Sequence, residues 1–193
     1  MNNICTSITE EFCSNSIKSF SDFNYKGFTK GISLIRSADK IFVFGIGHSG
    51  LFGKILSMKL NHAGLRTFTV FDEINPPFSK KDLFIAISQS GETSTIITLA
   101  EKAKKLGGRV LGISANKVSR LAALSDTLIH LKARSEELDF PVLSAIGDKK
   151  HQNLSGILFG YNMYVLFYAL IIKIIELQGE SPESIDGRHA TLQ

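Results

Sequence analysis

The sequence contains little cysteine, which limits the kinds of site and of environment that it predicts. Its two cysteines, Cys5 and Cys13, lie in one segment with helical periodicity and lack the spacing of metal ligands. Disulfide frameworks are typical of small secreted domains, whereas a chain of 193 residues can bury a core without them. We therefore expect a reduced, cytoplasmic protein that has no metal site and no secretory signal peptide.

The sequence also lacks a strong excess of one charge. It has 22 basic against 18 acidic residues, and the basic residues are scattered along the chain. Nucleic-acid-binding proteins instead gather Lys and Arg into a patch or stripe. Pairs such as Lys80–Lys81 are typical of a solvated surface. The charge pattern therefore argues against nucleic acid as a partner.

Only one long apolar run is present, Leu154–Ile175, and it is long enough to cross a bilayer. Gly156, Gly160 and Lys173 interrupt this run, and no second run accompanies it. We therefore predict no membrane span. The run instead predicts a long helix, about residues 153–178, that is buried at a subunit interface.

A glycine-rich turn stands at the centre of what the sequence does contain. Ile41–Phe44 has the length and the β-branched and aromatic content of a buried strand, and it leads into Gly45–Gly50, with the sequence GIGHSG. A helical pattern begins at Leu51. Glycines permit a tight turn close to a ligand, and the free N–H groups of a helix start favour an anion. This turn predicts a phosphate site.

A second strand-turn-helix unit repeats the first. The strand Leu83–Ile87 leads into the sequence SQSGET, which supplies the hydroxyls of Ser88, Ser90 and Thr93 at the start of an amphipathic helix. Neutral donors of this kind suit a phosphate dianion. The alternative is that Ser90 and Thr93 only cap the helix and that Gly91 eases the turn.

The alternation of strands and helices predicts an α/β fold, a three-layer α/β/α sandwich around a five-stranded parallel sheet. The predicted strands are Ile41–Phe44, Arg66–Phe71, Leu83–Ile87, Val110–Ile113 and Thr127–Leu131. In the flavodoxin-like order 2-1-3-4-5, the two strands that precede the special turns are neighbours at the switch point, where a crevice opens. We expect a single domain over residues 1–193, with N-terminal packing helices in residues 1–37 and an irregular flap at residues 136–153.

A dinucleotide-binding fold is a competing interpretation. Gly45–Gly50 matches the pattern G-x-G-x-x-G, and Asp72 lies near the position of the acid that binds the ribose. The sequence has neither a second mononucleotide-binding half nor a separate substrate domain, which most such dehydrogenases need. We therefore favour a phosphorylated small molecule over a nicotinamide cofactor.

The two turns together resemble the phosphosugar loops of the SIS (sugar isomerase) domain family, and the resemblance covers most of the chain. Asp72–Pro77 and the terminal Arg188-His189 are most similar to the 6-phospho-3-hexuloisomerases of that family. The resemblance implies an SIS fold, no cofactor, and a homo-oligomer, a tetramer or a dimer, in which the C-terminal His of one subunit reaches the site of another. It also implies a bound sugar 6-phosphate. The predicted phosphate- and substrate-binding residues are Gly47, His48, Ser49, Glu73, Ser88, Gln89, Ser90 and Thr93.

Isomerisation of such a sugar needs a base and an acid that move a proton through an enediol. In the hexuloisomerases the base is a Glu early in the long helix, and the matching residue here is Gly160. Glu92 and His189 are the candidate catalytic residues. Arabinose 5-phosphate isomerases of the same family have a functional Glu at the place of Glu92, although a Glu there also complements a helix dipole. His189 belongs to the family motif, and imidazole titrates near neutral pH. Glu73 is a weaker candidate.

The sequence therefore predicts a sugar-phosphate isomerase that converts 6-phospho-3-hexulose to fructose 6-phosphate. Because of Gly160, a protein that binds phosphosugars without converting them is an alternative. An arabinose 5-phosphate isomerase is another, but those enzymes have a Lys where this sequence has His48. An exposed loop residue is also an adequate interpretation of His48.

Overall fold

The computed structural model describes residues 3–133 and 153–189. The helices are α1 (Ile4–Ser21), α2 (Tyr25–Arg36), α3 (His48–His62), α4 (Ser94–Lys105), α5 (Arg120–Leu124), α7 (Asn153–Gln178) and α8 (Pro182–Asp186). The strands are β1 (Ile41–Gly45), β2 (Thr67–Thr69), β3 (Leu83–Ile87), β4 (Arg109–Ser114) and β5 (Thr127–His130). All strand pairs are parallel, in the order β2-β1-β3-β4-β5, which confirms the predicted fold class.

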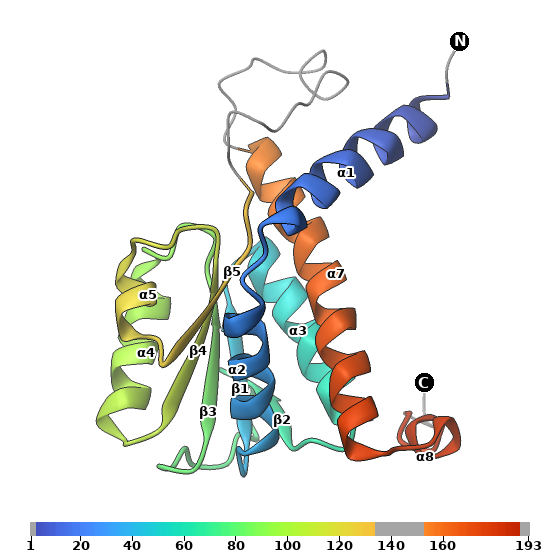
Figure 1. Cartoon of the computed structure of the whole chain (residues 1–193). Coiled ribbons are helices and arrows are strands. Elements are labelled where there is room, and N and C mark those ends of the chain that lie inside the picture. The colour runs from blue at the N-terminus through green and yellow to red at the C-terminus, as the bar shows by residue number, and fades with distance from the viewer. Residues whose placement is uncertain (1–2, 134–152, 190–193) are drawn as a thin grey trace.

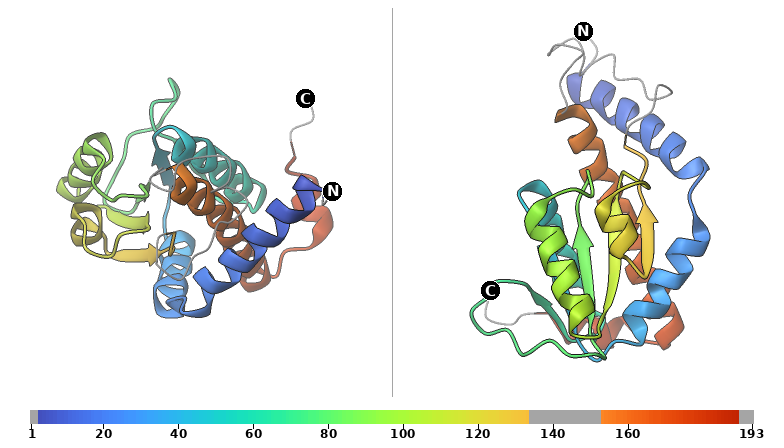
Figure 2. Two further views of the ribbon diagram at one scale, coloured as in Figure 1. Left: turned by 90° about the horizontal axis from the view of Figure 1, so that it is seen from above. Right: turned by 90° about the vertical axis from the view of Figure 1, so that its left-hand side faces the viewer.

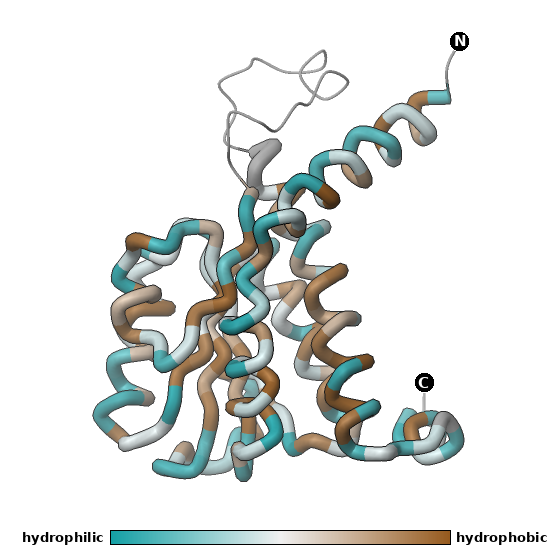
Figure 3. The backbone as a smooth tube through the Cα atoms, viewed as in Figure 1, coloured by the Kyte–Doolittle hydropathy of each residue, from teal (hydrophilic) through white to brown (hydrophobic). Residues whose placement is uncertain are grey.

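The sheet is covered on both faces, as Figures 1 and 2 show. Side chains alternate along the strands, so that Val43 and Ile85 enter the core beneath α2, α3 and α7, whereas Phe42 and Phe84 pack against α4 and α5. The strands therefore contain near-continuous apolar sequence because both of their faces are buried. The hydrophobic segments of the backbone lie mainly along the sheet and α7 (Figure 3).

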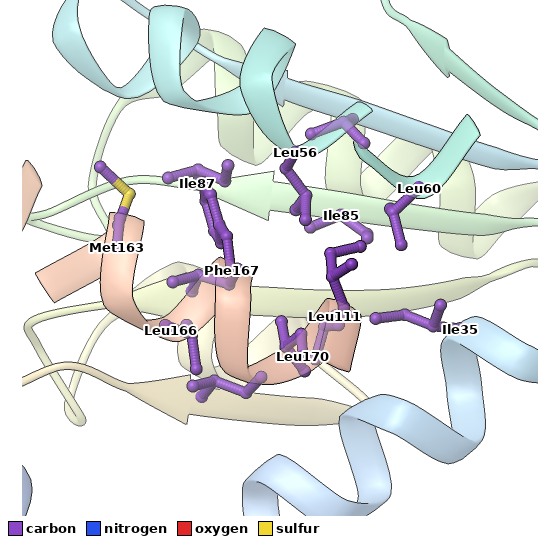
Figure 4. Packing of buried hydrophobic residues seen from close by; sticks show 14 of the residues in the cluster. Ile35, Leu56, Leu60, Ile85, Ile87, Leu111, Met163, Leu166, Phe167 and Leu170 are labelled. Carbon is purple, nitrogen blue, oxygen red and sulfur yellow. The ribbon is translucent and has the colours of Figure 1, made fainter. Parts of the chain in front are cut away.

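The long helix α7 belongs to the core rather than lying on it. Phe167 and Leu170 are fully buried and pack with Ile85 and Ile87 of β3 (Figure 4). The helix is long and apolar enough to cross a membrane, but 56% of an apolar window within it is buried inside the protein. Its bounds agree with the predicted helix, about residues 153–178.

The second strand is shorter than predicted. We expected Arg66–Phe71, but β2 spans only Thr67–Thr69, because Phe71 has a left-handed backbone with φ of 72° and turns the chain away from the sheet. The Phe71 ring then packs edge-on against Phe44, with 5.1 Å between ring centroids. The predicted flap, residues 136–153, lies outside the described residues except for the residue that begins α7.

The register of β1 against β3 sets the position of the two special turns. Gly45, the last residue of β1, is paired with Ile87, the last residue of β3. The two turns therefore leave the sheet side by side and at the same level. The helices that follow diverge, because α3 packs on one face of the sheet and α4 on the other. This divergence opens the predicted crevice at the switch point.

Candidate functional site

A cleft of about 820 Å³ opens where β1 and β3 end. The predicted site residues that line it are His48, Ser49, Ser88, Gln89, Ser90, Glu92 and Thr93. The lining also includes residues that sequence reasoning missed, namely Ala115 and Asn116 after β4 and Gly156 and Ile157 at the start of α7. Three strand ends and one helix therefore contribute to a single site.

The first turn depends on its glycines for close backbone contacts. A Cβ added to Gly45 would lie 2.6 Å from the carbonyl group of Ser49, and one added to Gly50 would lie 2.8 Å from the carbonyl oxygen of Gly45. Gly47 is at the N-cap of α3 with φ of 59° and has no side chain that can cap the helix. The first N–H groups of α3 are thus left without a side-chain acceptor.

The second turn is held by its own hydroxyl groups. Ser88 Oγ accepts a hydrogen bond from the N–H of Gly91 at 3.1 Å and lies 3.0 Å from Thr93 Oγ1. Ser90 Oγ accepts a bond from the N–H of Glu92 at 3.2 Å. Thr93 is at the N-cap of α4, but its side chain makes no capping hydrogen bond. The interpretation of Thr93 as a simple helix cap is therefore wrong.

The starts of α3 and α4 differ from those of α1, α2, α5 and α8. In each of those four helices a side chain at the N-cap accepts a hydrogen bond from the first turn; the four residues are Asn3, Asn24, Ser119 and Ser181. At α3 and α4 no side chain does so, and both helices begin at the cleft. A helix start with free N–H groups has a partial positive charge and attracts an anion.

The end of β4 and the residues that follow it support the second turn. Ser114 Oγ donates a hydrogen bond to the carbonyl oxygen of Gln89 at 3.1 Å, and Asn116 Nδ2 donates one to that of Ser90 at 3.2 Å. Both bonds therefore hold main-chain carbonyl groups of the second turn in place. The signal for this support in the sequence is weak: one polar residue, Ser114, ends the strand, and a second, Asn116, follows it closely.

Glu92 lines the cleft but already has a structural partner. Its Oε1 accepts a hydrogen bond from the backbone N–H of Arg120 at 2.8 Å, at the start of α5. The carboxylate thus ties the second turn to the next helix. A catalytic role for Glu92 stays a prediction.

His189 lies far from the cleft of its own chain. Its ring packs on that of His62 at the C-terminal end of α3, with 4.0 Å between ring centroids. Arg188 fixes this end of the chain by donating to Glu180 Oε2 at 2.7 Å and to the carbonyl oxygen of His62 at 2.8 Å. Helix α3 begins at the cleft and has 15 residues, so His189 is about 20 Å away by the helical rise. Figure 1 shows α8 at this far end.

The remaining predicted residues lie outside the cleft lining. Glu73 is exposed beyond β2 and is not among the described residues that line the cleft, whereas Gly47 lines a smaller pocket of about 190 Å³ beside it. Within residues 3–133 and 153–189, no group of three His, Cys, Asp or Glu side chains is arranged to hold a metal ion.

Comparison with known proteins places this geometry in a family. Residues 34–149 match the SIS domain. The chain belongs to the SIS domain family. It is 32% identical to the 3-hexulose-6-phosphate isomerase of Bacillus subtilis over 82% of this chain and 83% of that protein. The enzyme of the same name from Methylomonas aminofaciens is 30% identical over 85% of this chain and 86% of its own length.

One solved structure superposes on almost the whole of this chain. It is a hypothetical protein from Methanococcus jannaschii, for which a 3-hexulose-6-phosphate isomerase function was inferred. The TM-score is 0.78, with 25% sequence identity, and the superposition covers 97% of this chain and 99% of the other. The sequence resemblance to the SIS family is therefore confirmed, as is the SIS fold.

Proposed function

We propose that this SIS protein is a sugar-phosphate isomerase that interconverts 6-phospho-3-hexulose and fructose 6-phosphate through an enediol. The observation that carries the proposal is the pair of helix starts without side-chain caps, α3 and α4, which face one cleft together with the hydroxyls of Ser49, Ser88 and Thr93. The names of the relatives from Bacillus subtilis and Methylomonas aminofaciens support the choice of substrate.

The sugar phosphate binds with its dianion between the two turns. Backbone N–H groups at the helix starts and the hydroxyls of Ser49, Ser90 and Thr93 donate to the phosphate oxygens. The sugar extends toward Asn116 and Ile157, which line the rest of the cleft. Because the phosphate does not react, its binding energy serves to hold the reacting carbons in place.

The whole chain, residues 1–193, functions as one phosphosugar-binding domain in a cytoplasmic homo-oligomer, a tetramer or a dimer. In this assembly His189 of one subunit completes the site of a neighbour, because the distance along α3 keeps it from its own cleft. Exposed apolar residues on α7 support such a contact; they are Ile157, Tyr161, Tyr164, Val165, Tyr168 and Ile172. Burial of this face removes apolar area from water.

The test is an assay of the purified protein with fructose 6-phosphate and with 6-phospho-3-hexulose, each followed by NMR. We expect interconversion of the two sugars. The variant with both Ser49→Ala and Ser90→Ala should bind fructose 6-phosphate at least about tenfold more weakly, because hydrogen bonds to a charged group are lost. Absence of turnover with both sugars, and with arabinose 5-phosphate, would refute the proposed isomerase.

A binding protein without catalysis is the second candidate. Two observations favour it: Gly160 presents no carboxylate to the cleft, and Glu92 already accepts a bond from Arg120. A ligand that binds only the folded state raises the melting temperature. Thermal stabilisation by fructose 6-phosphate without any product would therefore identify this second function.

A further inference from the structure

Only two side chains with acid-base chemistry line the described part of the cleft, His48 and Glu92. The carboxylate of Glu92 accepts a hydrogen bond from the N–H of Arg120. The imidazole of His48 makes no hydrogen bond to the described residues and contacts the ring of Phe52 edge-on, with 4.9 Å between ring centroids. Among the described residues that line the cleft, His48 is therefore the acid-base group whose side chain is not held by a hydrogen bond within the protein.

The position of the His48 ring depends on Gly160, a buried residue of α7 that packs directly against the ring. A Cβ added to Gly160 of α7 would lie 2.5 Å from His48 Cε1, 3.1 Å from His48 Nδ1 and 2.8 Å from Phe52 Cε2. Any side chain at residue 160 would therefore collide with the imidazole. The imidazole ring of His48 therefore occupies the volume that a side chain at residue 160 would fill, and the ring lies against α7.

His48 is also the first residue of α3, directly beside Ser49 and the free N–H groups of the helix start. If the phosphate binds at the start of α3, the sugar carbons extend from it into the part of the cleft between the second turn and α7. The imidazole touches the α7 side of that space. An imidazole can accept and return a proton near neutral pH, which is what an enediol mechanism requires.

We propose that His48 is the catalytic base of this protein, a role that rests on the proposed isomerase function. Starting from fructose 6-phosphate, the imidazole takes the proton of C3, the C–H electron pair forms the double bond of the enediolate, and the carbonyl electrons move onto the C2 oxygen. A proton passes from the C3 oxygen to the C2 oxygen. The imidazolium then returns its proton to C2, which leaves the carbonyl at C3.

The first experiment compares the wild-type protein with His48→Gln. Exchange of the C3 hydrogen of fructose 6-phosphate in deuterated water is followed by NMR, and kcat and KM are measured for the isomerisation. General-base catalysis contributes at least about a hundredfold, so kcat and the exchange rate should fall by that factor or more. KM and the affinity for fructose 6-phosphate should change by less than about threefold, because the phosphate contacts are kept.

The second experiment moves the ring without replacing it. In Gly160→Ala the new methyl group displaces the imidazole, so kcat should fall about tenfold or more. The matched control is Gly53→Ala on α3, whose Cβ would meet Val43 at an ordinary 3.4 Å; its kcat should stay unchanged. If the ring is what the alanine disturbs, adding Gly160→Ala to His48→Gln should cost nothing further.

Each result bears on the proposal. If the wild type isomerises and His48→Gln keeps its kcat, the assignment of His48 is overturned while the proposed function stands. The same conclusion follows if His48→Gln loses affinity instead of kcat, because the ring would then be a ligand only. If fructose 6-phosphate raises the melting temperature of the wild type but is neither exchanged nor isomerised, the proposed function fails, and the base with it. A poorly folded Gly160→Ala leaves His48→Gln to decide.

Discussion

At the scale of single residues, Gly47 and Gly91, the glycines of the two turns that have positive φ, make a matched pair. Gly47 has open space around its missing Cβ, whereas a Cβ on Gly91 would lie 2.2 Å from Ser119 Oγ. We predict that Gly47→Ala lowers the free energy of unfolding by about 1 to 3 kcal/mol, the cost of holding an alanine in a backbone conformation, φ 59° and ψ −129°, that glycine adopts far more readily. Gly91→Ala should lower the free energy of unfolding by about 1 to 3 kcal/mol more than Gly47→Ala does, because its methyl group overpacks against Ser119. Urea denaturation measures both, and equal losses would contradict the role of Ser119.

The contact between His48 and Gly160 marks the limit of prediction from sequence at this scale. Each turn is encoded locally, by glycines and hydroxyls that directly follow an apolar strand. The histidine meets the glycine only because α3 and α7 pack together in three dimensions. Neither residue has a local signal for this contact, so the sequence left His48 as a possible loop residue and Gly160 as a missing carboxylate. The placement of Asn116 behind the second turn was missed for the same reason.

At the scale of elements, the start of α4 separates capping from ligand binding. Thr93→Val removes a hydroxyl that makes no capping bond, so stability should fall by about 1 kcal/mol or less, the value of one hydrogen bond. Its affinity for fructose 6-phosphate should fall about tenfold, because a donor to a charged group is lost.

The control for Thr93→Val is Asn24→Ala, because Asn24 caps α2 by accepting from the N–H of Gly27 at 3.2 Å. Loss of this cap should cost about 1 kcal/mol of stability and leave the affinity unchanged. Urea denaturation and calorimetric titration give the two quantities. If Thr93→Val keeps its affinity, this hydroxyl does not contact the phosphate.

The elements themselves were largely predictable because strand and helix periodicities are strong in a buried parallel sheet. Leu83–Ile87 is buried on both faces and has the predicted bounds. The prediction was wrong at β2. Arg66–Phe71 alternates polar and apolar residues as a strand does, but the strand ends at Thr69, and the left-handed Phe71, whose ring packs on Phe44, turns the chain away from the sheet.

At the scale of the whole molecule, two histidines make stability depend on pH. Burial, together with the charges of His189 and Lys59, lowers the pKa of His62 below its ordinary 6.5. Burial and the charge of Lys117 do the same to the pKa of His130. In the window below 6.5 the unfolded chain therefore binds more protons than the folded one, so stability rises with pH. The contribution is complete above pH 6.5 and is lost as the pH falls through the lower folded-state values.

This pH dependence is measurable by urea denaturation between about pH 5 and 7.5, a window that brackets the ordinary histidine pKa. The free energy of unfolding should decrease toward the acidic end. The double variant His62→Gln, His130→Gln should show a flatter profile. An unchanged slope in the double variant would assign the effect to other groups.

The end of the cleft where we propose that the phosphate binds is formed by the starts of α3 and α4, whose main-chain N–H groups every amino acid provides. Substitution of a side chain in these turns should therefore weaken the binding of a phosphate rather than abolish it. We expect discrimination between one sugar and another to come instead from the rest of the cleft lining, which includes Asn116 and the start of α7. A search for altered specificity, whether in natural variants or by directed evolution, should accordingly concentrate its substitutions there and spare the glycines.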